Sequence, residues 1–146
     1  MKKLFTLLVV TLLTGVGVAF ADNDKAIDFN QLPEKAQKFI KTHFPNYEIS
    51  YAKEDVDFFY SEYEVMLVNG TKLEFTSSGD WKDVECRVGE VPAAIVPKQI
   101  KEYVGKKYPD AKILKIDREN ANYDIELSNR LELTFDKKYR LIDIDD

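Results

Sequence analysis

Cys86 and His43 are the only cysteine and histidine of the chain, and these side chain types often carry nucleophilic or metal chemistry. Nothing in the residues around either one indicates a catalytic pair, and a second histidine for an ordinary metal site is missing. We expect Cys86 to be a small apolar residue near the end of a strand, with intermolecular pairing or a reactive thiol as the alternative. His43 is expected to be a solvated residue at a helix end. No catalytic residue is predicted, and the protein is not expected to be an enzyme.

Carboxylates are the other side chains that could do chemistry, because oxygen ligands hold hard cations. Asp143, Asp145 and Asp146 stand among the last residues, and Asp83 and Glu85 hold similar places earlier. They lack the glycine turn and the ligand spacing of a calcium loop, and strand alternation already explains two of them as solvent-facing. The sequence also has no glycine-rich phosphate loop, nucleophile elbow or metalloprotease helix. We therefore predict no metal site and no cofactor.

Residues 1–21 have the pattern of a cleavable secretory signal. Lys2 and Lys3 precede an apolar run over residues 4–20, which ends at the small-residue site Ala19-Phe20-Ala21. A membrane anchor is disfavoured because the run is short, contains glycine and ends at a cleavage site. We expect a mature chain that starts at Asp22, does not insert into the membrane, and resides in the periplasm or is secreted.

The charge of the chain limits its partners. Acidic side chains outnumber basic ones by 26 to 21, and Lys2 and Lys3 leave with the signal. Nucleic acid is not an expected partner, because phosphate binding needs clustered lysine and arginine. A basic protein or peptide is the better electrostatic match.

Residues 32–84 and 96–144 are similar to each other, which indicates that one unit was duplicated. The first copy carries a short insertion in one loop. The matching segments include Leu32-Pro33 with Val96-Pro97, and Phe44-Pro45 with Tyr108-Pro109.

The periodicity of each copy changes along its length. Apolar residues at helical spacing predict a short amphipathic helix after each leading proline. Alternation with a period of two then predicts strands, and Asn69-Gly70 predicts a hairpin turn. The predicted fold is α+β, with two tandem repeats over residues 22–88 and 89–146 that pack as one unit. Each repeat is a short helix on a four-stranded antiparallel meander, with strands at 48–53, 63–68, 72–76 and 81–85 in the first copy and, in the second, beginning with 112–117 and 123–128.

This pattern resembles a known family. The resemblance rests on the Leu-Pro starts, the helices that end in aromatic-Pro, the Tyr-x-Val/Ile-x-Leu strands at 63–67 and 123–127, and Asp80-Trp81. The chain resembles the PepSY-like, beta-lactamase-inhibitor-like (BLIP-like) exported proteins of Bacteroidetes, which occur as tandem repeats. The resemblance implies a helix plus a four-stranded sheet, used twice, with the helices on one face. It brings no site residues with it.

The face opposite the helices is the predicted binding surface. Alternation makes this face acidic, with aromatic and aliphatic residues concentrated in the first repeat. Aromatic anchors ringed by polar groups are typical of protein interfaces. We expect an exported binding module that binds a protein or peptide through this face, and inhibition of an exported enzyme is one form of this role. The alternative is a structural envelope protein that homodimerises through the same face. The predicted contact residues are Phe58, Tyr60, Glu64, Met66, Glu74, Trp81 and Asp83.

The insertion of the first copy places three aromatic residues after a run of acids. In register with Tyr63, Phe59 is expected to point inward, and Phe58 and Tyr60 outward. The sequence leaves two interpretations open: the loop folds back and buries these rings, or it is a binding loop.

Overall fold

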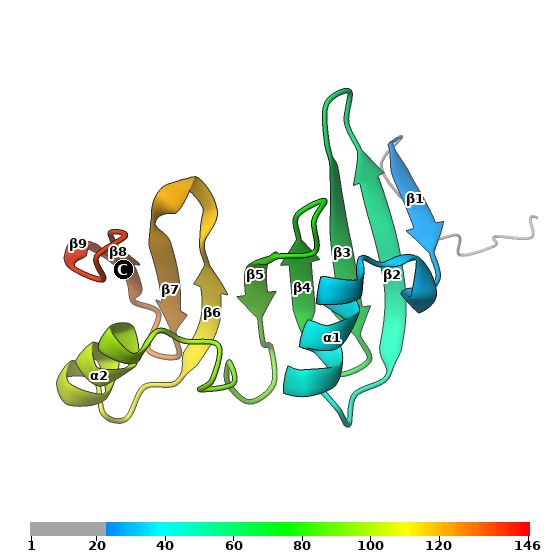
Figure 1. The fold of residues 1–146 in the computed structure, drawn as a ribbon. Coiled ribbons are helices and arrows are strands. Elements are labelled where there is room, and N and C mark those ends of the chain that lie inside the picture. Colours follow the sequence, from blue (N-terminus) through cyan, green and yellow to red (C-terminus); the bar gives the residue numbers. More distant parts are fainter. Residues whose placement is uncertain (1–22) are drawn as a thin grey trace, which may run out of the picture.

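Residues 23–146 form one nine-stranded antiparallel sheet with two α-helices on one of its faces (Figure 1). These are the residues that the computed structural model describes, and the predicted signal, residues 1–21, lies outside them. Each strand pairs with the strands next to it in the sequence, so the order across the sheet is β1 to β9. The elements are β1 (Asp24–Ile27), η1 (Phe29–Gln31), α1 (Glu34–His43), β2 (Ile49–Val56), β3 (Ser61–Leu67), β4 (Lys72–Phe75), β5 (Trp81–Glu85), α2 (Lys98–Lys107), β6 (Ile113–Asp117), η2 (Glu119–Ala121), β7 (Tyr123–Leu127), β8 (Glu132–Phe135) and β9 (Leu141–Asp145).

Each α-helix begins directly after a proline. Pro33 and Pro97 have φ angles of −52° and −53°, which the proline ring favours and which suit a helix start. Their carbonyls accept the first helical hydrogen bonds, from the amides of Gln37 at 3.1 Å and Lys101 at 3.0 Å. Helices of 10 residues are marginal by themselves in water, so packing on the sheet must stabilise them.

The core lies between the helices and the sheet. Phe75 is fully buried, and the ring of Phe39 from α1 packs edge-on against it at 5.6 Å. Phe135 holds the same position under α2, where Tyr103 packs edge-on at 5.5 Å. Each buried aromatic ring contributes about 2–3 kcal/mol relative to an exposed one, so these pairs fix the helices to one face.

The sheet is continuous across the middle of the molecule. β5 pairs with β6 through Asp83↔Asp117, Val84↔Ile116 and Glu85↔Lys115. The α+β class is confirmed, but the strands make a single sheet where the sequence analysis expected a four-stranded sheet in each repeat. That sheet includes β1, which was not predicted because its sequence, Asp-Lys-Ala-Ile, shows no apolar alternation.

The turn between β4 and β5 requires its glycine. Gly79 has a φ of +87°, and a Cβ at this position would lie 2.8 Å from the Cβ of Pro33. Its amide donates to the carbonyl of Thr76 at 2.9 Å. In the turn between β8 and β9, Tyr139 has a φ of 60°, and its amide donates to the carbonyl of Asp136, also at 2.9 Å. The two turns therefore have the same form, although only the first one lies tight against a helix start.

Candidate functional site

A row of carboxylates crosses the helix-free face of the sheet. The register places one acid from each strand between β3 and β7 directly opposite the next. Adjacent strands are about 4.8 Å apart, and like charges directly opposite each other destabilise a sheet. Such a row costs stability, which makes it a candidate for function. We call it the acidic row: Glu64, Glu74, Asp83, Asp117 and Asp124.

Two lysines beside the acidic row neutralise part of its charge. The Nζ of Lys72 lies 3.1 Å from Glu74, 3.9 Å from Asp83 and 3.9 Å from Glu85. The Nζ of Lys115 lies 3.8 Å from Asp83. Burial lowers the pKa of Lys72, but the hydrogen bond to Glu74 and the nearby carboxylates outweigh it, so the pKa is raised overall. Both lysines therefore lie at the centre of the row, and the carboxylates around them outnumber them, so the row keeps a net negative charge.

Asp83 is the least exposed member of the acidic row. Only 3% of the residue is accessible, and its Oδ1 atom has no hydrogen-bond partner among the described residues. The pKa of this carboxyl is raised to about 7, mainly by burial and also by Glu74 and Asp117, against the opposing effect of Lys115 and Lys72. Asp83 is thus partly protonated near neutral pH.

The β2 end of the acidic row is closed by hydrogen bonds. Lys53 pairs with Asp24 at 2.8 Å and with Glu64 at 3.6 Å. The Tyr51 hydroxyl donates to Glu64 at 2.7 Å. The hydrogen bond to Asp24 is the main reason that the pKa of Lys53 is raised. Glu64 is therefore fixed in place by two neighbouring side chains.

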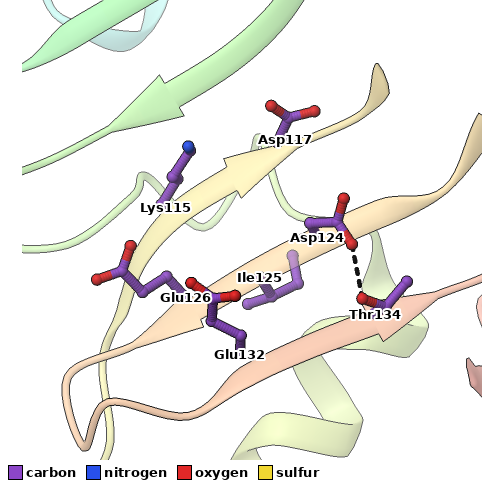
Figure 2. Close-up of a pocket in the computed structure, with 7 residues that line it drawn as sticks. All are labelled: Lys115, Asp117, Asp124, Ile125, Glu126, Glu132 and Thr134. Atoms are coloured by element: carbon purple, nitrogen blue, oxygen red, sulfur yellow. Dashed lines mark hydrogen bonds between the residues drawn. The ribbon is translucent and has the colours of Figure 1, made fainter. Parts of the chain in front are cut away.

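A shallow hollow of about 200 Å³ lies at the other end of the acidic row, over β6 to β8 (Figure 2). The Thr134 hydroxyl donates to Asp124 at 2.7 Å, and the remaining carboxylates stand around the hollow without meeting at one point (Figure 2). Among the described residues, no group of three histidine, cysteine or acidic side chains could hold a metal ion. The hollow is lined by Lys115, Asp117, Asp124, Ile125, Glu126, Glu132 and Thr134.

Trp81 lies on the helix side of the sheet, so its predicted place on the helix-free face is wrong. A β-bulge shifts the register between β4 and β5, so that Trp81 pairs with Phe75 while Asp83 stays opposite Glu74. The indole stacks on Phe39 of α1, with ring centres 6.2 Å apart. Simple alternation failed here because the bulge adds one residue to β5.

The aromatic loop between β2 and β3 is exposed. Phe58, Phe59 and Tyr60 are 97%, 95% and 55% accessible, so the rings do not fold back into the core. The amide of Asp57 donates to the carbonyl of Tyr60 at 2.9 Å, which closes the turn. Figure 1 shows this hairpin projecting beyond the other strands. The expected inward orientation of Phe59 is wrong, because the residue belongs to the turn and not to β3. We call residues 57–60 the aromatic tip.

The other predicted contact residues are on the expected face. Glu64 and Glu74 are in the acidic row with Asp83, and Met66 lies opposite Lys72 next to it. Their role in binding stays a prediction. The sequence analysis did not include the acidic-row residue Asp117, nor Lys53 and Lys115. Their alternation in β2 and β6 was the available signal, since Lys115 and Asp117 are two residues apart.

The surroundings of Cys86 and His43 do not favour reactivity. Cys86 is buried to 3% accessibility, and burial raises the pKa of its thiol, so the reactive thiolate is disfavoured. His43, at the end of α1, packs on the ring of Phe39 at 4.6 Å, and burial lowers its pKa. Both residues therefore have packing roles in the structure.

The chain belongs to the family described as "putative beta-lactamase-inhibitor-like, PepSY-like", whose model matches residues 10–59 and 61–143. The resemblance seen in the sequence is thus confirmed. This family is not a known enzyme family. A search of curated proteins found no match.

Three solved structures are similar to this chain over most of its length. A "putative calcium-regulated periplasmic protein" of Bacteroides thetaiotaomicron is 50% identical, with a TM-score of 0.83, and the match covers 86% of this chain and 98% of that one. A "putative periplasmic protein" of Bacteroides vulgatus is also 50% identical, with a TM-score of 0.84 and coverage of 87% and 100%. A second one from B. vulgatus, a "putative periplasmic protein of unknown function", is 34% identical, with a TM-score of 0.80 and coverage of 84% and 99%.

The expected location, periplasmic or secreted, is confirmed as periplasmic, since all three similar structures are described as periplasmic proteins. Neither α-helix in residues 23–146 has the length and apolar composition needed to cross a bilayer.

Proposed function

We propose that the protein is a non-enzymatic periplasmic module that binds a protein or peptide through the aromatic tip and the helix-free face. The exposure of Phe58 and Phe59, 97% and 95%, is the observation that carries this proposal. Two adjacent phenyl rings in water gain about 2–3 kcal/mol each when a partner buries them. Large rigid aromatic side chains are also common anchors at protein interfaces.

The acidic row supports a basic partner. Its carboxylates outnumber the lysines beside it, and Asp55 beside the aromatic tip and Asp57 within it add negative charge. A partner with an apolar pocket rimmed by lysine or arginine would match both features. Inhibition of an exported enzyme is the narrower form of this proposal, and the family description is what suggests it.

Homodimerisation through the same face is the less favoured alternative. A twofold dimer would place the acidic row against a second acidic row, with carboxylates that lack cations between them. Sedimentation of the mature chain checks this point. A stable dimer that protects the aromatic tip would support the structural role and contradict the binding module.

Site-specific crosslinking tests the proposal. A photoreactive phenylalanine analogue at position 58 should capture a partner in periplasmic extract, and the same analogue at position 68 should not. Val68 is a matched control because it is 65% exposed and directly follows the far end of β3. The captured protein is then purified and its affinity measured. We expect Phe58→Ser with Phe59→Ser to weaken binding at least about tenfold. The control is Val68→Ser with Val88→Ser, since Val88 is also exposed, at 67%, and lies outside the aromatic tip; it should have little effect. Equal crosslinking at both positions, or none, would contradict the assignment.

Calcium could modulate this face, and the description of the B. thetaiotaomicron relative as calcium-regulated motivates this second proposal. Asp83 carries a buried Oδ1 with no partner among the described residues, in a row of acids that attracts cations. No three acidic side chains of residues 23–146 converge on one ion position, so calcium would act here through one or two carboxylates of the row. Bound calcium would neutralise the acidic row and weaken a basic partner. Partner affinity is measured with calcium and with magnesium at equal ionic strength. General screening weakens binding equally with both ions, whereas specific calcium binding weakens it more with calcium.

We also propose that α1–β5 and α2–β9 are duplicated copies of one unit, each a helix on four strands. In support, the register shifts fall at corresponding places, between Glu74 and Phe75 and between Thr134 and Phe135. Cross-strand NMR contacts that place the two bulges at different positions would contradict the duplication.

A further inference from the structure

β9 is an edge strand that leaves apolar side chains uncovered. Its inner edge pairs with β8, and no strand within residues 23–146 pairs with its outer edge. Ile142 and Ile144 are 56% and 48% accessible. The free amides and carbonyls of such an edge are a template for another strand.

β5 shows what covers a strand of this kind. Val84 in β5 lies opposite Leu73 of the preceding strand, as Ile144 in β9 lies opposite Leu133. Val84 is nevertheless fully buried, because β6 pairs with β5 and places Ile116 opposite it. An antiparallel strand with an apolar side chain at this position would cover Ile144 in the way that β6 covers Val84.

The charges along β9 indicate what else such a strand would carry. Lys115 of β6 lies opposite Glu85 and contacts Asp83 at 3.8 Å. Asp145 and Asp143 hold the corresponding places in β9, since they pair with Glu132 and Thr134 of β8. Neither forms an ion pair with any described residue, and both are exposed. Basic side chains are the electrostatic match for these positions.

We propose that the outer edge of β9 binds an extended peptide segment by antiparallel strand addition. The peptide places an apolar side chain opposite Ile144 and basic side chains opposite Asp143 and Asp145. Main-chain hydrogen bonds supply affinity in this binding mode, and alternate side chains supply specificity. A second copy of the chain fits poorly, because antiparallel β9 strands would set aspartates opposite aspartates. This site is separate from the aromatic tip and the acidic row.

A designed peptide tests the proposal directly. The probe copies residues 112–118 with lysine in place of Asp117, giving Lys-Ile-Leu-Lys-Ile-Lys-Arg. The control peptide has glutamate at the two positions that face Asp143 and Asp145. Fluorescence anisotropy with the mature chain should show saturable binding of the basic peptide and none of the acidic one. Absence of saturable binding would overturn the proposal. The aspartates would then serve only to prevent association of β9 with other strands.

Charge reversal on the protein locates the site. Asp143→Lys with Asp145→Lys should weaken the basic peptide at least about tenfold and allow the acidic peptide to bind. The control is Glu48→Lys with Glu90→Lys, which makes the same change in net charge at two exposed positions away from β9. This control should stay within about twofold of the original affinity. Equal losses in the two variants would show non-specific attraction and overturn the assignment.

Two further measurements decide the occupant. In amide NMR spectra, the peptide should shift the signals of residues 141–146 and leave those of residues 57–60 unchanged. Shifts centred on the aromatic tip would contradict the β9 site. Sedimentation without peptide should show a monomer. A dimer that the Asp143→Lys, Asp145→Lys variant disrupts would assign the edge to a second copy and overturn peptide binding.

Discussion

The segments α1–β5 and α2–β9 have the same order of helix and strands, but they differ in how their loops and last strands are used. The β2–β3 connection carries the exposed aromatic tip, whereas the β6–β7 connection is the short helix η2. β5 lies inside the sheet between β4 and β6, whereas β9 lies at its edge. Corresponding positions in the two segments therefore differ in exposure, because different loops and strands lie next to them.

The turns at Gly79 and Tyr139 should show the largest difference. Gly79→Ala forces a Cβ to within 2.8 Å of Pro33 at a φ of +87°, so we expect it to lower the free energy of unfolding by about 2–3 kcal/mol. Tyr139→Ala keeps a non-glycine residue in a turn that already holds one, and should cost about 1 kcal/mol through lost ring packing. Urea unfolding measures both. Equal costs would mean that α1 adjusts to the added methyl group.

The next comparison concerns the ends of β5 and β9. Val84→Ala removes methyl groups from a fully buried site and should cost about 2 kcal/mol. Ile144→Ala acts at a side chain that is 48% exposed and should cost less than about 1 kcal/mol. Thermal unfolding of the two variants checks this order. A larger loss at Ile144 would show that β9 is covered in solution.

The smallest expected effect depends on pH and concerns Asp83 and Asp143. The pKa of Asp83 is raised from 3.8 to about 7 in the folded protein, mainly by burial. Between these values the folded state holds a proton that the unfolded state has lost, so stability falls as pH rises toward 7. Asp83→Asn removes this loss and should stabilise the protein by roughly 1–2 kcal/mol above pH 7, with the gain disappearing near pH 4.

Asp143→Asn is the control for that measurement, because Asp143 is the exposed counterpart of Asp83. It should change stability by less than about 0.5 kcal/mol at every pH. Urea unfolding between pH 4 and pH 8 gives both curves. A gain for Asp83→Asn that does not depend on pH would contradict the raised pKa.

The sequence was enough to predict the helices, most strands and the face of the sheet that Glu64, Glu74 and Asp83 occupy. Prolines and helical spacing placed α1 and α2, and alternation placed Glu64 and Glu74 correctly. Trp81 was misplaced because a β-bulge depends on how two strands pair, which no single strand reveals.

The burial of Asp83 was also beyond reach from the sequence. In its own strand it alternates as a solvent-facing acid, and only the pairing of β5 with β6 covers it. The aromatic tip could be found but not oriented, because its exposure depends on where β3 begins. Sequence patterns thus predicted local structure, and the unpredicted properties came from neighbouring strands.

Trp81 is the only tryptophan of the chain, and it lies where α1 meets the second half of the sheet. The guanidinium of Arg118, which follows β6, lies 3.9 Å from the centre of its indole ring, and Arg118 Nε donates to the Trp81 carbonyl at 2.6 Å. Any separation of β6 from β5 would remove a cation from the indole ring and admit water. The intrinsic tryptophan fluorescence of the unlabelled protein therefore reports whether β5 and β6 remain paired.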